Sequence, residues 1–174
     1  SHYEATLNRI HREKVALLVQ DTTSLNYTAH PATSDLGPIN TTADGAIGLE
    51  VHDTMAFNLE GTPLGLADVQ CWARDPKDTG KKYRRWDLPI EQKESYKWLA
   101  SFKKALEAQK RCPNTMLVSV GDREADIYEL FRLALKDPSG PKLLVRAMQN
   151  RLLAEDGGHL WKEMALKPVS GTQI

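Results

Sequence analysis

The chain has 174 residues, of which 41% are hydrophobic and 26% charged, as is typical of one globular domain with a full core. Lysine plus arginine equals aspartate plus glutamate, 23 each, so the overall charge indicates no partner. The longest apolar runs fall far short of the roughly 20 residues that span a bilayer, which argues against a transmembrane helix. Cys71 and Cys112 form no CxxC motif, so we expect no zinc site and a reducing, cytoplasmic location.

The first half of the sequence predicts a helix followed by three strands. Residues 3–14 have the spacing of a short amphipathic helix, and residues 15–20 (VALLVQ) form a strand buried on both faces. Residues 29–45, rich in Pro, Gly, Ser and Thr, predict a loop. Residues 46–58 and 64–73 then form the two strands of a hairpin.

The second half alternates helices and strands after a basic loop at residues 74–90. Apolar residues at helical spacing predict a helix over 91–112, and residues 115–120 form a second buried strand. A helix with Ile127, Leu130, Phe131, Ala134 and Leu135 on its inner face follows, then a strand over 142–148 and a short helix near 159–166.

This order predicts an α/β fold with a mixed sheet, an antiparallel meander followed by parallel strands. The helix over 91–112 is the crossover that parallel neighbours require. We therefore expect the strand before Asp122 to lie beside, and parallel to, the strand before Asp21.

Two aspartates follow these two apolar strands, in LVQDTTS (Asp21) and LVSVGDRE (Asp122). Ligands bind at the carboxyl ends of parallel strands in open sheets. Two close carboxylates repel each other, and a Mg²⁺ ion with hard oxygen ligands removes that cost. The pair therefore predicts a magnesium-dependent phosphoryl-transfer site, although an aspartate at a strand end also commonly caps a helix or turns the chain.

Four segments extend this interpretation: VQDTTSLNYT, PLGLADVQCWARDP, KESYKWL and GDREADIYEL. Together they resemble the cut-and-paste DDE transposases of bacterial insertion sequences, in particular the transposon-five branch of insertion-sequence family four. The resemblance runs in order from about residue 15 to residue 151.

The resemblance implies an RNase H-like core with a five-stranded sheet flanked by helices. Asp21 and Asp122 would be the first two acids of the DDE triad, and Mg²⁺ or Mn²⁺ would occupy a two-metal site. The reaction would comprise strand nicking, hairpin formation and strand transfer on transposon-end and target double-stranded DNA. The family acts as a homodimer on paired DNA ends, so a bacterial cytoplasmic protein, associated with the nucleoid when bound to DNA, is expected.

Further site residues follow from the resemblance or from position. Arg146, in LLVRA, matches an arginine implicated in holding the end DNA, and Arg123 matches the arginine of the DREAD motif. Thr22, Glu124 and Asp126 are candidates to support the two acids, although Glu124 and Asp126 also suit a helix start. The basic loop carries Lys81, Lys82, Arg84 and Arg85, which either contact DNA phosphates or form a solvated loop.

One departure from the family pattern concerns the third acid, which sits there in a helix with a Tyr-Arg-Glu-Lys signature. This sequence contains no such string. We expect residues 1–151 to form the catalytic core with the first two acids. Residues 152–174 would begin an inserted region that stops before the third acid, a Glu outside this chain. The isolated chain is then expected to be inactive.

Two other functions stay open. GDREAD also fits the acidic motif of haloacid-dehalogenase-type phosphatases, with Asp122 and Asp126, but that class has DxD at its first motif and position 23 here is Thr. The hairpin over 46–73 does not belong to that fold either. The other alternative is a non-catalytic DNA-binding or regulatory fragment that pairs with a full-length transposase.

Overall fold

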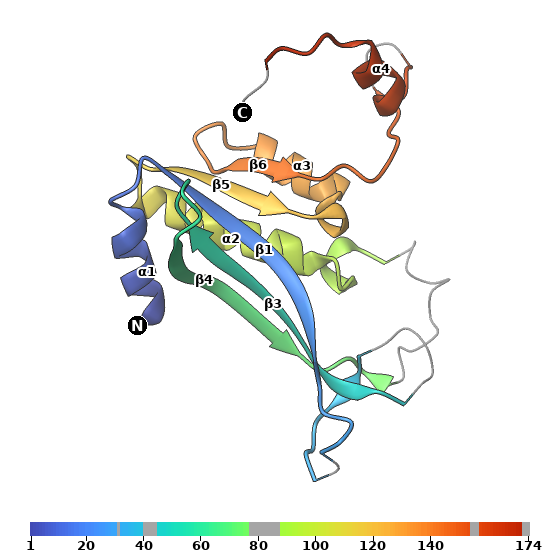
Figure 1. Ribbon diagram of the computed structural model, residues 1–174. Coiled ribbons are helices and arrows are strands. Elements are labelled where there is room, and N and C mark those ends of the chain that lie inside the picture. The colour runs from blue at the N-terminus through green and yellow to red at the C-terminus, as the bar shows by residue number, and fades with distance from the viewer. Residues whose placement is uncertain (31, 40–44, 77–87, 154–156, 172–174) are drawn as a thin grey trace.

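The computed structural model describes residues 1–30, 32–39, 45–76, 88–153 and 157–171. A mixed α/β sheet lies at its centre, with strand order β2-β3-β1-β5-β6 and β4 paired with β3 (Figure 1). The strands are β1 (Val15–Asn26), β2 (Gly37–Pro38), β3 (Ile47–Phe57), β4 (Pro63–Trp72), β5 (Met116–Gly121) and β6 (Lys142–Val145). The helices are α1 (His2–Ile10), α2 (Tyr96–Arg111), α3 (Tyr128–Leu135) and α4 (Leu160–Leu166), with 3-10 turns at Ile90–Gln92 and Arg123–Ala125.

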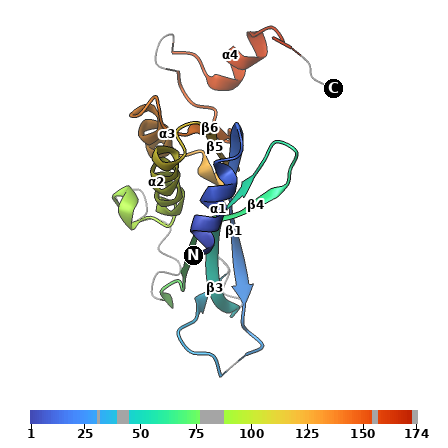
Figure 2. The same cartoon turned by 90° about the vertical axis from the view of Figure 1, so that its left-hand side faces the viewer.

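The strand directions confirm the mixed sheet that the sequence predicts. β1, β3 and β4 form an antiparallel meander, whereas β5 lies parallel to β1 and β6 parallel to β5. Helix α2 is the crossover between the two parts, and α2 and α3 lie together on one side of the sheet (Figure 2). The sheet has six strands rather than the expected five because β2, inside the predicted loop, pairs with the start of β3.

Three element boundaries differ from the sequence prediction, each for a local reason. β1 continues to Asn26 because its ladder with β3 extends to the pair Asn26–Gly48. α2 begins at Tyr96 because Lys93 is extended and separates it from the preceding 3-10 turn. β6 ends at Val145: the next amide, of Arg146, still donates to Gly121 of β5, but those of Met148 and Gln149 donate to the side chain of Asp126.

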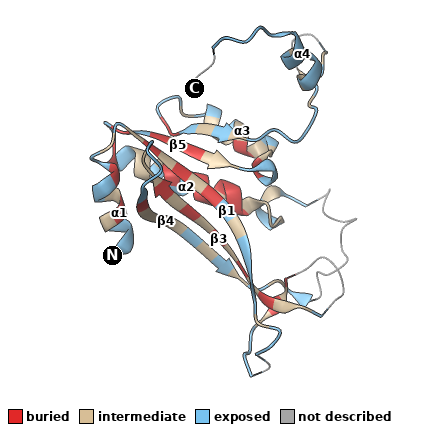
Figure 3. Ribbon diagram, in the orientation of Figure 1, coloured by how far each residue is buried: buried red, intermediate tan, exposed pale blue. Residues whose placement is uncertain are grey.

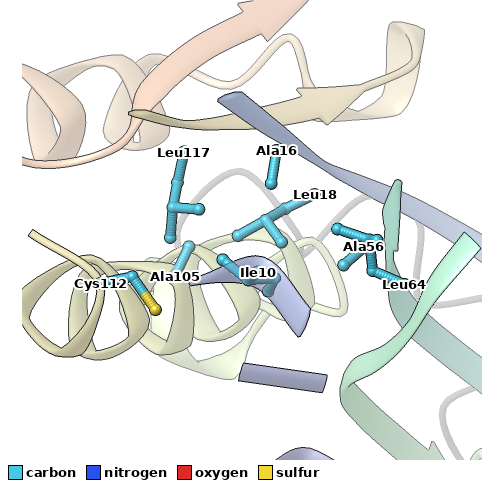
Figure 4. Close-up of a cluster of buried hydrophobic side chains, with 8 residues drawn as sticks. All are labelled: Ile10, Ala16, Leu18, Ala56, Leu64, Ala105, Cys112 and Leu117. Carbon is cyan, nitrogen blue, oxygen red and sulfur yellow. The ribbon is translucent and has the colours of Figure 1, made fainter. Parts of the chain in front are cut away.

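The buried residues lie on the central strands and on the helices packed against them (Figure 3). In β3 every second residue is buried, as period-2 alternation requires. One apolar cluster joins α1, α2 and the sheet, and Figure 4 shows its members pointing toward one another: Ile10, Ala16, Leu18, Ala56, Leu64, Ala105, Cys112 and Leu117. A second cluster packs α2 against α3, with members Trp98, Leu99, Phe102, Ala125 and Leu130.

The last described segment lies apart from this core. In Figure 1, α4 sits away from the sheet at the C-terminal side, and it has no buried residue. A short bridge between Leu152 and His159 precedes it. Among the helices that the structure describes, none combines the length and apolar character needed to cross a membrane.

Candidate active site

The parallel pairing of β1 with β5 confirms the arrangement expected for the two aspartates' strands. The register runs from Val15 opposite Met116 to Val19 opposite Val120. The ladder ends two residues before Asp21 on β1 and two residues before Asp122 on β5. Both aspartates are exposed, so the structure leaves their carboxylates accessible to solvent and ligands.

The position of Asp21 differs in one respect from the prediction that its strand ends there. β1 continues through Asp21 with β3 as its partner, while the β1–β5 ladder stops at Val19. Asp21 therefore lies where β1 separates from β5, at a fork between the parallel and antiparallel parts of the sheet. The strand continues because Thr22 and Ser24 find polar partners on β3, the imidazole of His52 and the carboxylate of Glu50.

Asp122 caps the 3-10 turn that follows β5. Its Oδ1 accepts a hydrogen bond of 2.8 Å from the backbone N–H of Glu124, so the capping role considered from the sequence is present. Gly121 precedes it at a close approach, because a Cβ there would lie 2.5 Å from Cβ of Ala125 and 3.2 Å from the Trp98 ring. Any larger residue at position 121 would displace the turn that carries Asp122.

A third carboxylate, which the sequence interpretation missed, lies beside Asp21. Asp53 on β3 is its direct cross-strand partner in the antiparallel ladder. Burial, and then the charge of Asp21, raise the pKa of Asp53 above its ordinary value. Like charges directly opposite each other destabilise a sheet, so this pair favours a cation. The alternation of β3 put Asp53 on one face, but only the register with β1 shows which residue it faces.

Thr22, predicted to support the acids, turns to the face opposite Asp21 and meets His52. Its Oγ1 lies 2.8 Å from Nδ1 of the imidazole. His52 is fully buried and packs edge-on against Trp98, with ring centroids 4.6 Å apart. Burial, and then the charge of Lys97, lower the pKa of His52 to about 4, against the opposing effect of Asp21. The imidazole is therefore neutral at pH 7, and a structural histidine is what the geometry shows.

The other two candidate supporting acids face different partners. Glu124 is exposed and pairs with the buried ammonium of Lys97 at 3.3 Å, which ties the turn after Asp122 to the start of α2. Asp126 accepts hydrogen bonds from the amides of Met148 and Gln149 and forms an ion pair with Arg151 at 2.6 Å. These bonds lower the pKa of the Asp126 carboxyl against the opposing effect of burial. Asp126 thus holds the segment after β6, and its role beside a metal stays a prediction.

The two candidate DNA-binding arginines lie near the same edge of the sheet. Arg123 is exposed and directly follows Asp122. Arg146 is also exposed, and its backbone N–H donates to the carbonyl of Gly121 at 3.1 Å, which places it level with the end of β5. The predicted contacts by Lys81, Lys82, Arg84 and Arg85 fall outside the described residues.

The donor set around Asp21 is made of carboxylate oxygens, the ligand type that Mg²⁺ and Mn²⁺ prefer. Asp21 and Asp122 are accessible, and Asp53 adds negative charge beside them. In the part of the chain that the structure describes, no three His, Cys, Asp or Glu side chains form a complete metal-binding group. Two carboxylates fit such an ion when water, phosphate oxygens or a further acid complete the shell.

Comparisons with known proteins add no assignment to this geometry, because no protein-family model matches the chain and no curated protein matches it either.

Proposed function

We propose that this chain is part of the catalytic core of a DNA transposase with an RNase H-like fold, and that Asp21 and Asp122 are two of its metal-binding acids. The observation that carries the proposal is the parallel register of β1 and β5, which ends two residues before each of these acids although they lie far apart in the sequence. The strand order and directions of the mixed sheet are compatible with that fold.

The negative charge of the site favours a reaction in which a cation lies between the protein and an anionic substrate. Asp21, Asp53 and Asp122 are all acidic, and DNA phosphates would be repelled without positive charge between them. A bound divalent ion supplies Lewis acidity at the scissile phosphate and lowers the pKa of a bound water. Asp21 and Asp122 would hold that ion, and Arg123 and Arg146 would position the phosphate backbone beside it.

The remaining features of the proposal lie outside this chain. A third acid, a Glu beyond the sequence, would complete a two-metal site, and a homodimer would bring two transposon ends together for strand transfer. We expect the chain alone to bind Mn²⁺ weakly and to leave transposon-end DNA uncut.

The test compares metal, DNA and phosphoester as ligands of the same chain. Mn²⁺ should broaden the NMR signals of the Asp21 and Asp122 amides first, and Asp21→Asn should reduce Mn²⁺ affinity, with Glu60→Gln, an exposed turn residue, as a control. Double-stranded DNA should bind with a steep salt dependence, and p-nitrophenyl phosphate should not be hydrolysed.

Each alternative gives a different result. Hydrolysis of p-nitrophenyl phosphate that depends on Asp122 would support the phosphatase. DNA binding with Mn²⁺ affinity unaffected by Asp21→Asn and Asp122→Asn would support a regulatory DNA-binding fragment. Mn²⁺ signals confined to other residues would refute the proposed site.

A further inference from the structure

A chain of hydrogen bonds between three buried side chains and the half-buried Thr22 links the three central strands next to the fork. We call it the relay; it consists of Thr22 and Gln20 on β1, His52 on β3 and Ser119 on β5. Thr22 Oγ1 lies 2.8 Å from His52 Nδ1, His52 Nε2 lies 3.2 Å from Gln20 Oε1, and Gln20 Nε2 donates to Ser119 Oγ at 2.8 Å.

The relay has one consistent assignment of donors and acceptors. The amide nitrogen of Gln20 donates to Ser119, so its oxygen accepts, and Nε2 of His52 carries the proton. Nδ1 then accepts from the Thr22 hydroxyl. His52, Gln20 and Ser119 are at most 4% exposed, so water does not replace a lost partner, and a register slip would leave buried polar groups unsatisfied.

Asp21 and Asp122 lie where the backbone ladder no longer holds their strands together. The β1–β5 pairing ends at Val19 and Val120, two residues before each aspartate. Gln20 and Thr22 flank Asp21, and the bond from Gln20 to Ser119 is a side-chain link from β1 to β5 next to the end of the ladder.

A second connection runs from the relay to the turn that carries Asp122. The His52 ring packs edge-on against Trp98, 4.6 Å between centroids. Trp98 in turn lies against Gly121, where even a Cβ would come within 3.2 Å of the indole. A change at His52 therefore reaches the residue before Asp122 by direct contact.

We propose that the relay is a positioning device, in which Thr22 and His52 hold Asp21 level with Asp122 across the fork. This inference rests on the proposed function, because a cation shared by Asp21 and Asp122 is what requires a fixed spacing between them. The relay residues point away from the exposed acids, so they act through the backbone of β1 and β5 and not by touching the ion or substrate.

The test uses one pair of variants at Thr22 and one matched control. Thr22→Val removes the hydroxyl, whereas Thr22→Ser keeps it. Thr54→Val makes the same isosteric change on the same buried face, at a hydroxyl that has no partner among the described residues. Two readouts are taken on the 174-residue chain: amide hydrogen exchange without metal, and Mn²⁺ affinity from water-proton relaxation.

Thr22→Val should weaken Mn²⁺ binding and speed exchange of the Glu124 and Arg146 amides by about two- to tenfold, the range of one hydrogen bond. These amides donate to Asp122 and Gly121, on the far side of β5 from Thr22, so damage confined to β1 would not reach them. Thr22→Ser and Thr54→Val should match the wild type in both readouts.

If the amides of Glu124 and Arg146 exchange at the wild-type rate in Thr22→Val, the relay is not a positioning device, whatever the Mn²⁺ affinity of that variant. If Thr22→Val does not fold, Ser119→Ala breaks the same relay from β5 and is judged by the same criteria. Mn²⁺ binding that is independent of Asp21 would refute the proposed function instead. The exchange data would still decide whether the relay fixes the positions of β1 and β5 at the fork.

Discussion

The two halves of β1 turn alternate side chains toward the same face of the sheet but are held there by different forces. In the first half, Ala16 and Leu18 enter the apolar cluster beneath α1 and α2 (Figure 4). In the second half, Gln20, Thr22 and Ser24 each bond to a side chain on a neighbouring strand. Apolar burial is non-directional, so the first half supplies stability, whereas directional bonds make the second half specify one register.

The placement of the candidate acids follows from this difference. Asp21 sits where the polar half begins, and its strand there has lost β5 as a partner. A polar network that is fully satisfied is rigid and unique, whereas an apolar contact tolerates repacking. The polar half therefore suits a site that needs a fixed spacing, and the following variants test each half.

The largest effect is expected in the apolar half, from Leu18→Ala. Leu18 is 1% exposed and borders a partly open pocket of about 260 Å³, so truncation removes core contacts that no neighbouring side chain is packed to replace. We expect a loss of about 2–5 kcal/mol in the free energy of unfolding, measured by urea denaturation. Leu25→Ala on the same strand, where Leu25 is 40% exposed, should cost far less; equal losses would contradict the division of β1 into two halves.

The second effect is the acid sensitivity of the polar half. The folded His52 has a pKa of about 4, below the unfolded value of 6.5. Its contribution to stability is therefore complete above pH 6.5 and is lost as pH falls toward 4, because the unfolded chain takes up the proton first. The loss is on the order of 3 kcal/mol.

The pH dependence is measured by urea denaturation at pH 7, 6, 5 and 4. His52→Gln should flatten the curve across that window, while His11→Gln, at an exposed position, should leave its shape unchanged. A wild-type curve that is flat between pH 6.5 and 4 would contradict a neutral, buried His52.

A smaller effect is expected to separate two threonines on this face of the sheet, the half-buried Thr22 and the buried Thr54. Thr22→Val leaves His52 Nδ1 without its donor and should destabilise the chain by about 1–3 kcal/mol. Thr54→Val removes a buried hydroxyl without a partner in the described structure, so it should be neutral or stabilising. Thermal unfolding at pH 7 provides the comparison, and a larger loss for Thr54→Val would reverse the interpretation.

The smallest effect on stability is expected from Asp53, on the opposite face of the sheet. Its folded pKa is raised, so the ionised carboxylate opposes folding once the pH exceeds the raised value, and this penalty disappears as pH falls toward 3.8 and below. Asp53→Asn should raise the melting temperature slightly at pH 7 in the presence of EDTA and change it little at pH 3. Glu60→Gln should show no such difference, and an equal gain at both pH values would exclude charge repulsion as the cause.

The sequence by itself determined most of the elements and the pairing of the two central parallel strands. Short apolar runs before Asp21 and Asp122, and the helical spacing from Trp98 to Ala105, are patterns among near neighbours in the chain. Such patterns survive in the structure because burial acts on each element's own periodicity. The same patterns missed β2 and ended β1 at Gln20 rather than Asn26.

The tertiary structure alone decided which side chains meet. Asp53 faces Asp21, Thr22 meets His52, and Asp126 turns to Arg151 instead of remaining beside Asp122. These partners lie 25 or more residues apart in the chain, and each depends on strand register or on the path of a loop. Register is set jointly by all the strand pairs and their buried partners, so no local pattern in the sequence contains it.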